Sequence, residues 1–161
     1  MKATTVCFLI RKRPSFAVLL GFKKLGFGSG KFTGIGGKVE PGETPAQAAI
    51  REVMEEIGVL ISPEDLRAMG RVTFLFPAKE DWDQEVWIFT AESWSGEPGE
   101  SDEIKPAWFD RSEIPYPSMW QDARHWLPPI LAGKEIDVTI TFHQDNEDVA
   151  SVVDHPRSKR G

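Results

Sequence analysis

Short apolar runs, separated by polar turns, predict most of the regular structure of this chain. Thr4–Ile10 and Phe16–Phe22 are rich in β-branched and aromatic residues, and the polar segment Arg11–Ser15 lies between them. This arrangement predicts a β-hairpin. Further strands are expected at Leu66–Phe76, Glu85–Ala91, Ala107–Asp110 and Ile136–Phe142.

Three polar or glycine-rich segments separate these strands and are expected to form loops. Gly26–Lys38 is rich in glycine, Pro77–Asp83 is a charged turn, and Ser93–Pro106 is acidic and contains glycine and proline. Such composition is typical of loops rather than of strands or helices. We therefore expect loops at all three segments.

The clearest helix is expected over Thr44–Ile57. Thr44 can act as the N-cap, Pro45 occupies the first helical position and Gln47 the third, which together make a capping box with proline at its preferred site. Gly58 supplies a C-terminal stop. An apolar stripe at spacings of three and four residues predicts the face that packs on a sheet; it comprises Ala46, Ala49, Ile50, Val53 and Ile57.

A second helix is expected near the C-terminus, over Met119–Trp126 and Pro129–Leu131, with a break near Pro128. The tail 155–161 is expected to be disordered. Strands that surround two helices favour a mixed α/β sandwich. The length of 161 residues favours a single domain over 1–161, because no linker or repeat divides the chain.

Composition and charge narrow the class of protein. Hydrophobic residues make up 40% and charged residues 27% of the chain, which is ordinary for a globular protein. A net charge of −6 argues against broad binding to nucleic acid or to an anionic membrane, and no stretch is apolar enough to span one. Cys7 is the only cysteine, so no internal disulfide can form and a cytoplasmic location is expected.

An acidic cluster lies on one face of the predicted helix. Glu55 and Glu56 follow Glu52 at spacings of three and four residues, so the three carboxylates are neighbours on the helix surface. Arg51 can pair with Glu55 but cannot neutralise all three. A divalent cation would relieve this repulsion, and Mg²⁺ prefers oxygen ligands that it shares with substrate phosphates.

Taken alone, the sequence REVMEE would most simply be a solvated acidic helix face. Its neighbours change the interpretation, because Gly36 and Gly37 end a glycine-rich loop just before the helix and Glu43 lies at the helix start. A phosphate-binding P-loop is excluded for GFGSGK, since Phe32 stands at the required Ser/Thr position.

The segment Gly37–Val59 resembles the Nudix box, G-x5-E-x7-R-E-U-x-E-E-x-G-U with U aliphatic. The matching residues are Gly37, Glu43, Arg51, Glu52, Val53, Glu55, Glu56, Gly58 and Val59. The resemblance implies an α/β/α sandwich with a mixed sheet and a hydrolase that cleaves a diphosphate bond with Mg²⁺, or with Mn²⁺ as a substitute.

The resemblance also implies roles for residues of the box. Glu52, Glu55, Glu56 and the Gly36 carbonyl would be metal ligands, while Arg51 and Glu43 would orient the carboxylates. Glu52 or Glu56 would accept the proton of the attacking water, and the sequence leaves the choice open. Loss of turnover in Glu56→Gln would be expected with an intact fold.

Outside the box, much of residues 4–143 is similar to a branch of the family that hydrolyses oxidised purine nucleoside triphosphates such as 8-oxo-dGTP, which sanitises the nucleotide pool. This similarity implies a further metal ligand at Glu100 and aromatic walls on which a purine can stack. The implied substrate-binding residues are Thr5, Lys23, Phe27, Thr33, Gly37, Phe74, Gln84, Trp120, Asp122, Trp126 and Phe142.

Three residues depart from the pattern of that branch. Ala123 replaces the second of two adjacent acidic residues, Thr33 replaces an asparagine and Gln84 replaces a methionine. A different purine triphosphate, including a methylated one, is therefore a rival substrate.

ADP-ribose, a dinucleoside polyphosphate and a capped RNA end are rival substrates within the wider family, and a non-catalytic binding module is a rival of a different class. The expected state is a monomer or weak dimer without a stable nucleic-acid or membrane partner.

Overall fold

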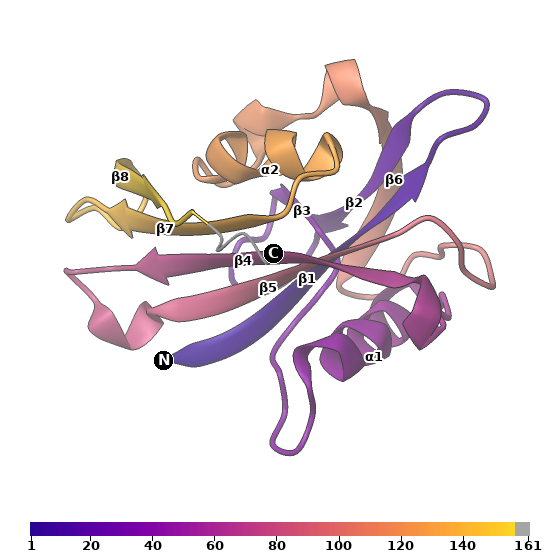
Figure 1. The fold of residues 1–161 in the computed structure, drawn as a ribbon, viewed down its shortest axis with the longest axis horizontal. Coiled ribbons are helices and arrows are strands. Elements are labelled where there is room, and N and C mark those ends of the chain that lie inside the picture. Colours follow the sequence, from indigo (N-terminus) through magenta and orange to yellow (C-terminus); the bar gives the residue numbers. More distant parts are fainter. Residues whose placement is uncertain (157–161) are drawn as a thin grey trace.

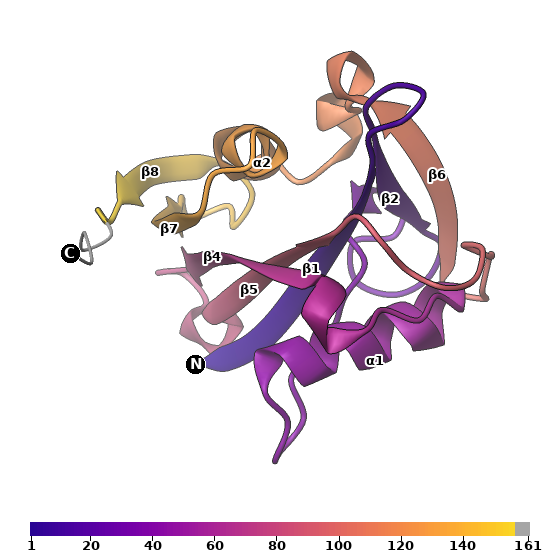
Figure 2. The ribbon, with the colours of Figure 1, turned by 45° about the vertical axis from the view of Figure 1, so that its right-hand side comes forward.

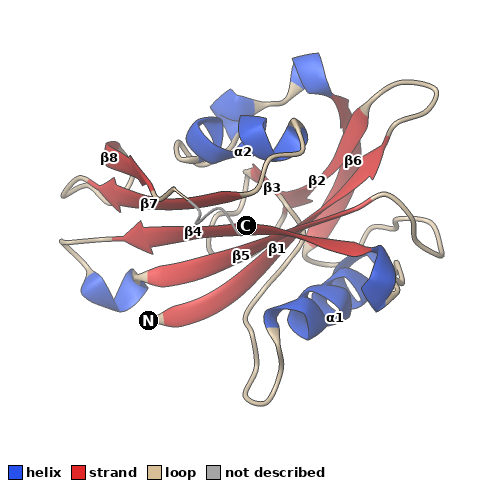
Figure 3. Cartoon of the chain, viewed as in Figure 1, coloured by secondary structure: helices blue, strands red, loops and turns tan. Residues whose placement is uncertain are grey.

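The computed structural model describes residues 1–156. These residues form eight strands in one mixed sheet and two α-helices, as Figure 1 and Figure 3 show. The strands are β1 (Lys2–Arg11), β2 (Ala17–Lys23), β3 (Phe32–Thr33), β4 (Leu66–Leu75), β5 (Gln84–Ala91), β6 (Ile104–Asp110), β7 (Ile136–Phe142) and β8 (Val149–Asp154). The helices are α1 (Pro45–Ile57) and α2 (Ala123–Leu131), with short 3₁₀ turns between elements.

The sheet has the order β3-β2-β1-β5-β4-β7-β8, and β6 pairs with β2 outside this path. The β1–β5 and β4–β7 pairs are parallel, and the other strand pairs are antiparallel. The two helices lie on opposite faces of the sheet, α1 on one side and α2 on the other (Figure 2). The expected α/β/α sandwich with a mixed sheet is therefore confirmed.

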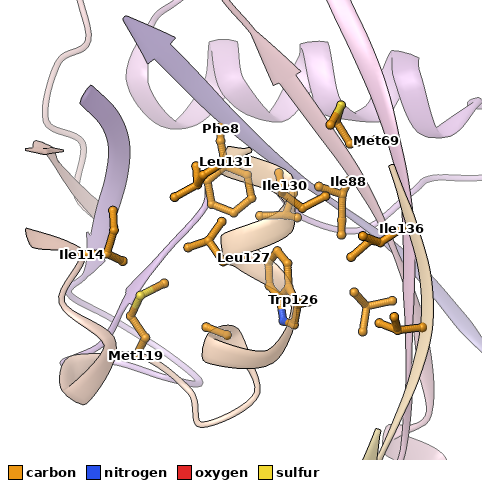
Figure 4. Close-up of a cluster of buried hydrophobic side chains, with 14 of the residues drawn as sticks. Phe8, Met69, Ile88, Ile114, Met119, Trp126, Leu127, Ile130, Leu131 and Ile136 are labelled. Atoms are coloured by element: carbon orange, nitrogen blue, oxygen red, sulfur yellow. The ribbon is translucent and has the colours of Figure 1, made fainter. Parts of the chain in front are cut away.

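Strand β1 divides the core in two because its side chains alternate between the faces of the sheet. Val6, Phe8 and Ile10 belong to the cluster beneath α2, while Cys7 and Leu9 belong to the cluster beneath α1. Figure 4 shows the first cluster, with Phe8 and the side chains of α2 between helix and sheet. Burial raises the pKa of the Cys7 thiol to about 12, so this cysteine packs as an apolar residue.

Helix α1 has the predicted ends. The Thr44 hydroxyl accepts a hydrogen bond from the Gln47 amide at 3.1 Å, and the Gln47 side chain accepts one from the Thr44 amide at 2.9 Å. Gly58 ends the helix in the left-handed region at φ 71°, which glycine adopts without steric cost. Local sequence therefore fixes both ends of α1.

Helix α2 differs from the prediction. It begins at Ala123 rather than Met119, because residues 119–122 are irregular, and it continues through Pro128 and Pro129 without a break. The prolines lack the amides that Arg124 and His125 would pair with, but both of those residues are exposed, so water can reach their carbonyls. Burial of the opposite face of the helix then holds the element together.

The other differences concern the sheet edges. Strand β6 begins at Ile104 inside the predicted loop Ser93–Pro106, because Ile104 is buried and pairs with Lys23 of β2. Strands β3 and β8 were not predicted. The β8 side chains are largely exposed, and backbone pairing with β7 holds the strand, so its sequence carries no alternating pattern.

The end of the chain is partly described. His155 of the predicted tail donates its amide to the Asp137 carbonyl at 2.8 Å, and residues 157–161 lie outside the described residues. Within residues 1–156, neither helix has the length and apolar character needed to cross a membrane.

Candidate active site

The segment Gly34–Gly37 lies against β1 and brings the glycine loop beside α1. Cys7 and Ile35 exchange backbone hydrogen bonds of 2.7 and 3.1 Å, and the Thr5 amide donates to the Gly37 carbonyl at 2.8 Å. A Cβ atom at Gly36 would lie 1.9 Å from the Thr5 carbonyl oxygen, and one at Gly37 would lie 2.5 Å from the Glu52 carboxylate. At Gly36 only glycine allows this approach, because the clash is with backbone, whereas a side chain at Gly37 would require the Glu52 carboxylate to move.

Arg51 binds the acidic residues of the box together. Its guanidinium pairs with both carboxylate oxygens of Glu43, at 2.7 and 2.9 Å, and donates to the Lys38 carbonyl at 3.0 Å. It also reaches Glu52 at 2.9 Å and Glu55 at 3.2 Å. The Arg51 hydrogen bonds lower the pKa of Glu43 to about 2, so this carboxylate is ionised at neutral pH.

Glu56 lies apart from this network and lines the large cavity described below. Its pKa is raised to about 7, first by burial and then by the charges of Glu52 and Glu103, while Lys23 and the Gly36 amide oppose the shift. Excess negative charge thus gathers around Glu56. A group with a pKa near neutrality can hold or release a proton under working conditions.

Glu100, the further metal ligand that the resemblance implied, pairs with a lysine in the structure. Its carboxylate forms an ion pair of 2.5 Å with Lys24, which lowers its pKa. Glu103, from the same acidic loop, is together with Glu52 one of the two residues whose negative charges raise the pKa of Glu56, and the sequence analysis did not assign it a role. Residues 1–156 contain no group of three or more His, Cys, Asp or Glu side chains already placed to hold a metal ion, and Glu52 and Glu55 both pair with Arg51.

A cavity of about 270 Å³ opens beside Gly36, Gly37 and Glu56 and extends to α2. It brings together every residue that the sequence predicted to bind substrate: Thr5, Lys23, Phe27, Thr33, Gly37, Phe74, Gln84, Trp120, Asp122, Trp126 and Phe142. Arg51, Glu43, Glu52, Glu55 and Glu100 are not among its lining residues. The phosphate-directed and base-directed candidates therefore meet at Gly36, Gly37 and Glu56.

Aromatic rings form much of the cavity wall. Phe27 stacks on Trp120 with ring centroids 5.2 Å apart and an interplanar angle of 22°, and Trp82 contacts Phe27 edge-on at 5.5 Å. Phe76 stacks on Phe142 at 4.5 Å. Trp82 and Phe76 are lining residues that the sequence analysis missed, Trp82 because it lies in a turn that is otherwise charged.

Asp122 is a buried carboxyl group in this wall, with 7% of its surface exposed. The Trp126 indole donates to one of its oxygens at 2.8 Å. Burial raises the pKa of Asp122, and the hydrogen bond from Trp126 opposes the shift. The Trp126 indole thereby fixes the orientation of Asp122 in the cavity.

Comparison with known proteins identifies the class. The model of the NUDIX domain family matches residues 1–129, so the chain belongs to the Nudix family. It is 47% identical over 117 residues to the oxidized purine nucleoside triphosphate hydrolase of Danio rerio. The aligned region covers 73% of each chain. It is 40% identical over 134 residues to the protein of the same name from Mus musculus, and this aligned region covers 83% of each chain.

A solved structure confirms the fold. The MutT protein of Bacillus halodurans superimposes with a TM-score of 0.81 over 98% of this chain and 100% of its own. Its sequence identity is 22%, so the likeness bears on architecture alone.

Proposed function

We propose that this protein hydrolyses purine nucleoside triphosphates, with a preference for oxidised forms such as 8-oxo-dGTP, to the monophosphate and pyrophosphate. The observation that carries the proposal is the aromatic cavity that opens directly beside Glu56 and Gly36–Gly37. Its aromatic walls suit a flat purine, and its lining also includes the loop and carboxylate implied for phosphate chemistry. The names of the relatives from Danio rerio and Mus musculus support the same substrate class.

The base would lie among the rings. Trp120 lines the cavity with Phe27, and base–aromatic stacking on such rings contributes about 1–3 kcal/mol. Asp122 offers a carboxyl oxygen that Trp126 does not use, and this oxygen can hydrogen-bond to the edge of the base. Lys23, beside Glu56, is positioned to meet a phosphate.

The donor set around α1 fits a divalent cation. Burial, and after it the charges of Glu52 and Glu103, raises the pKa of Glu56, so a bound cation would stabilise its ionised form. Glu52, Glu55, Glu56 and the Gly36 carbonyl would hold Mg²⁺, with Mn²⁺ as a substitute, and oxygen ligands are those that both ions prefer. Such an ion, when bound, offsets charge on phosphoryl oxygens and lowers the pKa of a bound water.

The remaining steps use residues of this chain. A carboxylate, Glu56 or Glu52, would take the proton of the attacking water. Arg51 would position Glu52 and Glu55, while Glu43 fixes the Arg51 guanidinium through two hydrogen bonds. Glu100 is a further candidate ligand only if it exchanges Lys24 for the ion.

The proposed activity would protect DNA by removing damaged precursors, and the single buried Cys7 suits a reducing cytoplasm. We expect a monomer or weak dimer.

A panel of nucleotides with Mg²⁺ tests the substrate. We expect the highest kcat/KM for 8-oxo-dGTP, followed by methylated and normal purine triphosphates, with ADP-ribose slow. Turnover of 8-oxo-dGTP no faster than dGTP, together with rapid cleavage of ADP-ribose, would contradict the proposal. Product analysis in ¹⁸O-labelled water then identifies the phosphorus that is attacked.

A further inference from the structure

Gln84, at the start of β5, brings an uncharged polar side chain to the wall of the cavity. Side chains along a strand alternate between the two faces of the sheet. Ile88 of β5 belongs to the core beneath α2 and Val86 packs against that core, so Gln84 lies on the same face. Phe74, directly opposite Gln84 on β4, also lies on this face and lines the cavity. The strand therefore directs Gln84 toward the cavity.

A hydrogen bond from the neighbouring strand holds the carboxamide of Gln84. Thr4 of β1 also lines the cavity, and its hydroxyl donates to Oε1 of Gln84 at 3.2 Å. The Glu85 carbonyl lies farther from the same hydroxyl, at 3.4 Å. Strands β1 and β5 pair in parallel register, with Lys2 opposite Gln84, so the backbone fixes the two side chains side by side. The oxygen of the carboxamide is therefore engaged, and its nitrogen lies on the other branch.

The amide nitrogen Nε2 of Gln84 is free to donate. Within residues 1–156 it makes no hydrogen bond, and it is not one of the side-chain atoms that are both unpaired and closed to solvent. Two other donors of the cavity wall are already engaged, the Trp126 indole with Asp122 and the Thr5 hydroxyl with the Gly37 carbonyl. Gln84 thus offers an uncharged N–H donor to a ligand in the cavity.

The sheet order places Gln84 nearer to the aromatic walls than to the glycine loop. The segment Gly34–Gly37 runs along one edge of β1, and β5 lies along the other edge. Neighbouring strands are about 4.8 Å apart, so Gln84 lies roughly 10 Å from the loop. The strands beyond it carry the rings of Phe74 and Phe142. A ligand group that meets Nε2 is therefore part of the base rather than of the phosphates.

An N–H donor discriminates between groups on the edge of a purine. It pairs with a carbonyl oxygen, whereas it is repelled by an amino group that also presents N–H. Guanine carries a carbonyl at C6, where adenine carries an amino group. Oxidation at C8 adds a second carbonyl to guanine and a first one to adenine. A fixed amide donor therefore favours oxidised purines and guanine over unmodified adenine.

We propose that Gln84 determines base specificity by donating a hydrogen bond from Nε2 to a carbonyl oxygen of the purine, with Thr4 holding the carboxamide in the required orientation. The proposal rests on the proposed function and assigns the recognition of carbonyl-bearing purines to a residue of β5. The methionine that Gln84 replaces has no N–H to donate. The contact acts on binding of the base and takes no part in proton transfer at the phosphates.

The test removes the donor in two ways. Gln84→Met removes it without adding charge, and Gln84→Glu keeps the shape but presents only acceptor oxygens. The exposed residue Gln144 does not line the cavity, so Gln144→Glu is a control with the same change of charge. Steady-state kinetics use dGTP and dITP with a carbonyl at C6, 8-oxo-dATP with one at C8, 8-oxo-dGTP with both, and dATP with neither. Calorimetry gives the Kd values of 8-oxo-dGMP and dAMP.

For Gln84→Met we expect kcat/KM of the purines whose carbonyl Gln84 contacts to fall about tenfold relative to dATP, mainly through KM. Gln84→Glu should fall further, because its oxygens repel the carbonyl, and its preference should move toward dATP, whose amino group can donate. The Kd ratio of the two monophosphates should change in the same direction. Gln144→Glu should behave as wild type.

Three results would overturn the proposal. Unchanged constants in Gln84→Met would mean that no contact is made. An equal loss for dATP and the carbonyl-bearing purines would indicate a sugar contact or a structural role. A carbonyl preference retained in Gln84→Glu would mean that the other end of the carboxamide faces the base.

Thr4→Val provides a variant that leaves Gln84 in place should substitution there impair folding. It keeps the branched shape and removes the hydroxyl that holds the carboxamide, so it should lower the same preference by a smaller factor. An unchanged preference in Thr4→Val would contradict the positioning role. If wild type binds the monophosphates but hydrolyses none of the five triphosphates, the proposed function fails alone, and the Kd ratio still tests Gln84.

Discussion

The two helices cover opposite faces of the sheet and are specified in different ways. Both ends of α1 follow from local signals, namely the Thr44–Gln47 capping box and the left-handed Gly58. Helix α2 contains Pro128 and Pro129 and has no side-chain cap at Asp122, yet it continues unbroken. Local signals position the carboxylates of α1, whereas burial against the sheet positions α2 and the Asp122–Trp126 pair at its start.

This difference separates two functions within one site. The carboxylates of α1 require fixed spacing along a single helix, which short-range rules supply. The proposed base cavity requires a fit among rings from β1, β3, β4, β7, α2 and three loops, which only the folded chain supplies. Substitutions on α1 should therefore change the rate of catalysis or the stability of the ends of that helix. Substitutions on α2 should change the free energy of unfolding of the whole domain.

The largest expected effect is a fall in kcat when a carboxylate of α1 is removed. Glu56→Gln should reduce kcat by at least about 100-fold, because the variant loses the carboxylate proposed to take the proton. The unfolding midpoint should be retained or raised, because the buried charge is removed. Glu64→Gln, an equal change of charge at an exposed residue, should leave turnover unchanged. Wild-type turnover in Glu56→Gln would exclude the proposed role.

The next largest effect is a loss of stability when a buried side chain of α2 is shortened. Leu127 is fully buried beneath the helix, so Leu127→Ala should reduce the free energy of unfolding by about 2–5 kcal/mol, measured by urea denaturation. A cost below about 1 kcal/mol would mean that burial is not what holds α2 to the sheet.

A smaller effect is expected at the N-terminus of α1. Thr44→Ala removes the side-chain cap and should cost about 1 kcal/mol. Ser62 precedes a 3₁₀ turn and makes no side-chain cap, so Ser62→Ala should stay within about 0.5 kcal/mol of wild type. Equal costs for the two variants in urea denaturation would argue against local specification of α1.

The smallest effect is a pH dependence at Asp122. Burial raises its pKa in the folded state, so the folded chain binds a proton more tightly than the unfolded chain does. The resulting stabilisation is fully present below the ordinary pKa of about 3.9 and is lost as pH rises through the raised value. Relative to Asp122→Asn, wild type should therefore lose stability between acidic and neutral pH. Parallel thermal unfolding midpoints for the two proteins would contradict this.

The sequence predicted the residues of both regions but not all of their geometry. The fixed spacing of the Nudix box identified α1, because a helix converts sequence distance directly into position. Trp82 escaped notice, since its turn is polar and only tertiary packing brings it to the cavity. The Lys24–Glu100 ion pair was equally invisible, because its partners lie seventy-six residues apart. Edge strand β8 lacked the apolar alternation by which strands are recognised.

Calorimetric titration of the protein with Mg²⁺ most directly tests the central claim that the α1 carboxylates hold a cation for phosphate chemistry. We expect saturable binding in wild type, strongly weakened in Glu52→Gln and Glu56→Gln, together with hydrolysis of 8-oxo-dGTP that rises with Mg²⁺ occupancy. Absence of Mg²⁺ and Mn²⁺ binding, with hydrolysis unaffected by a chelator, would contradict the account.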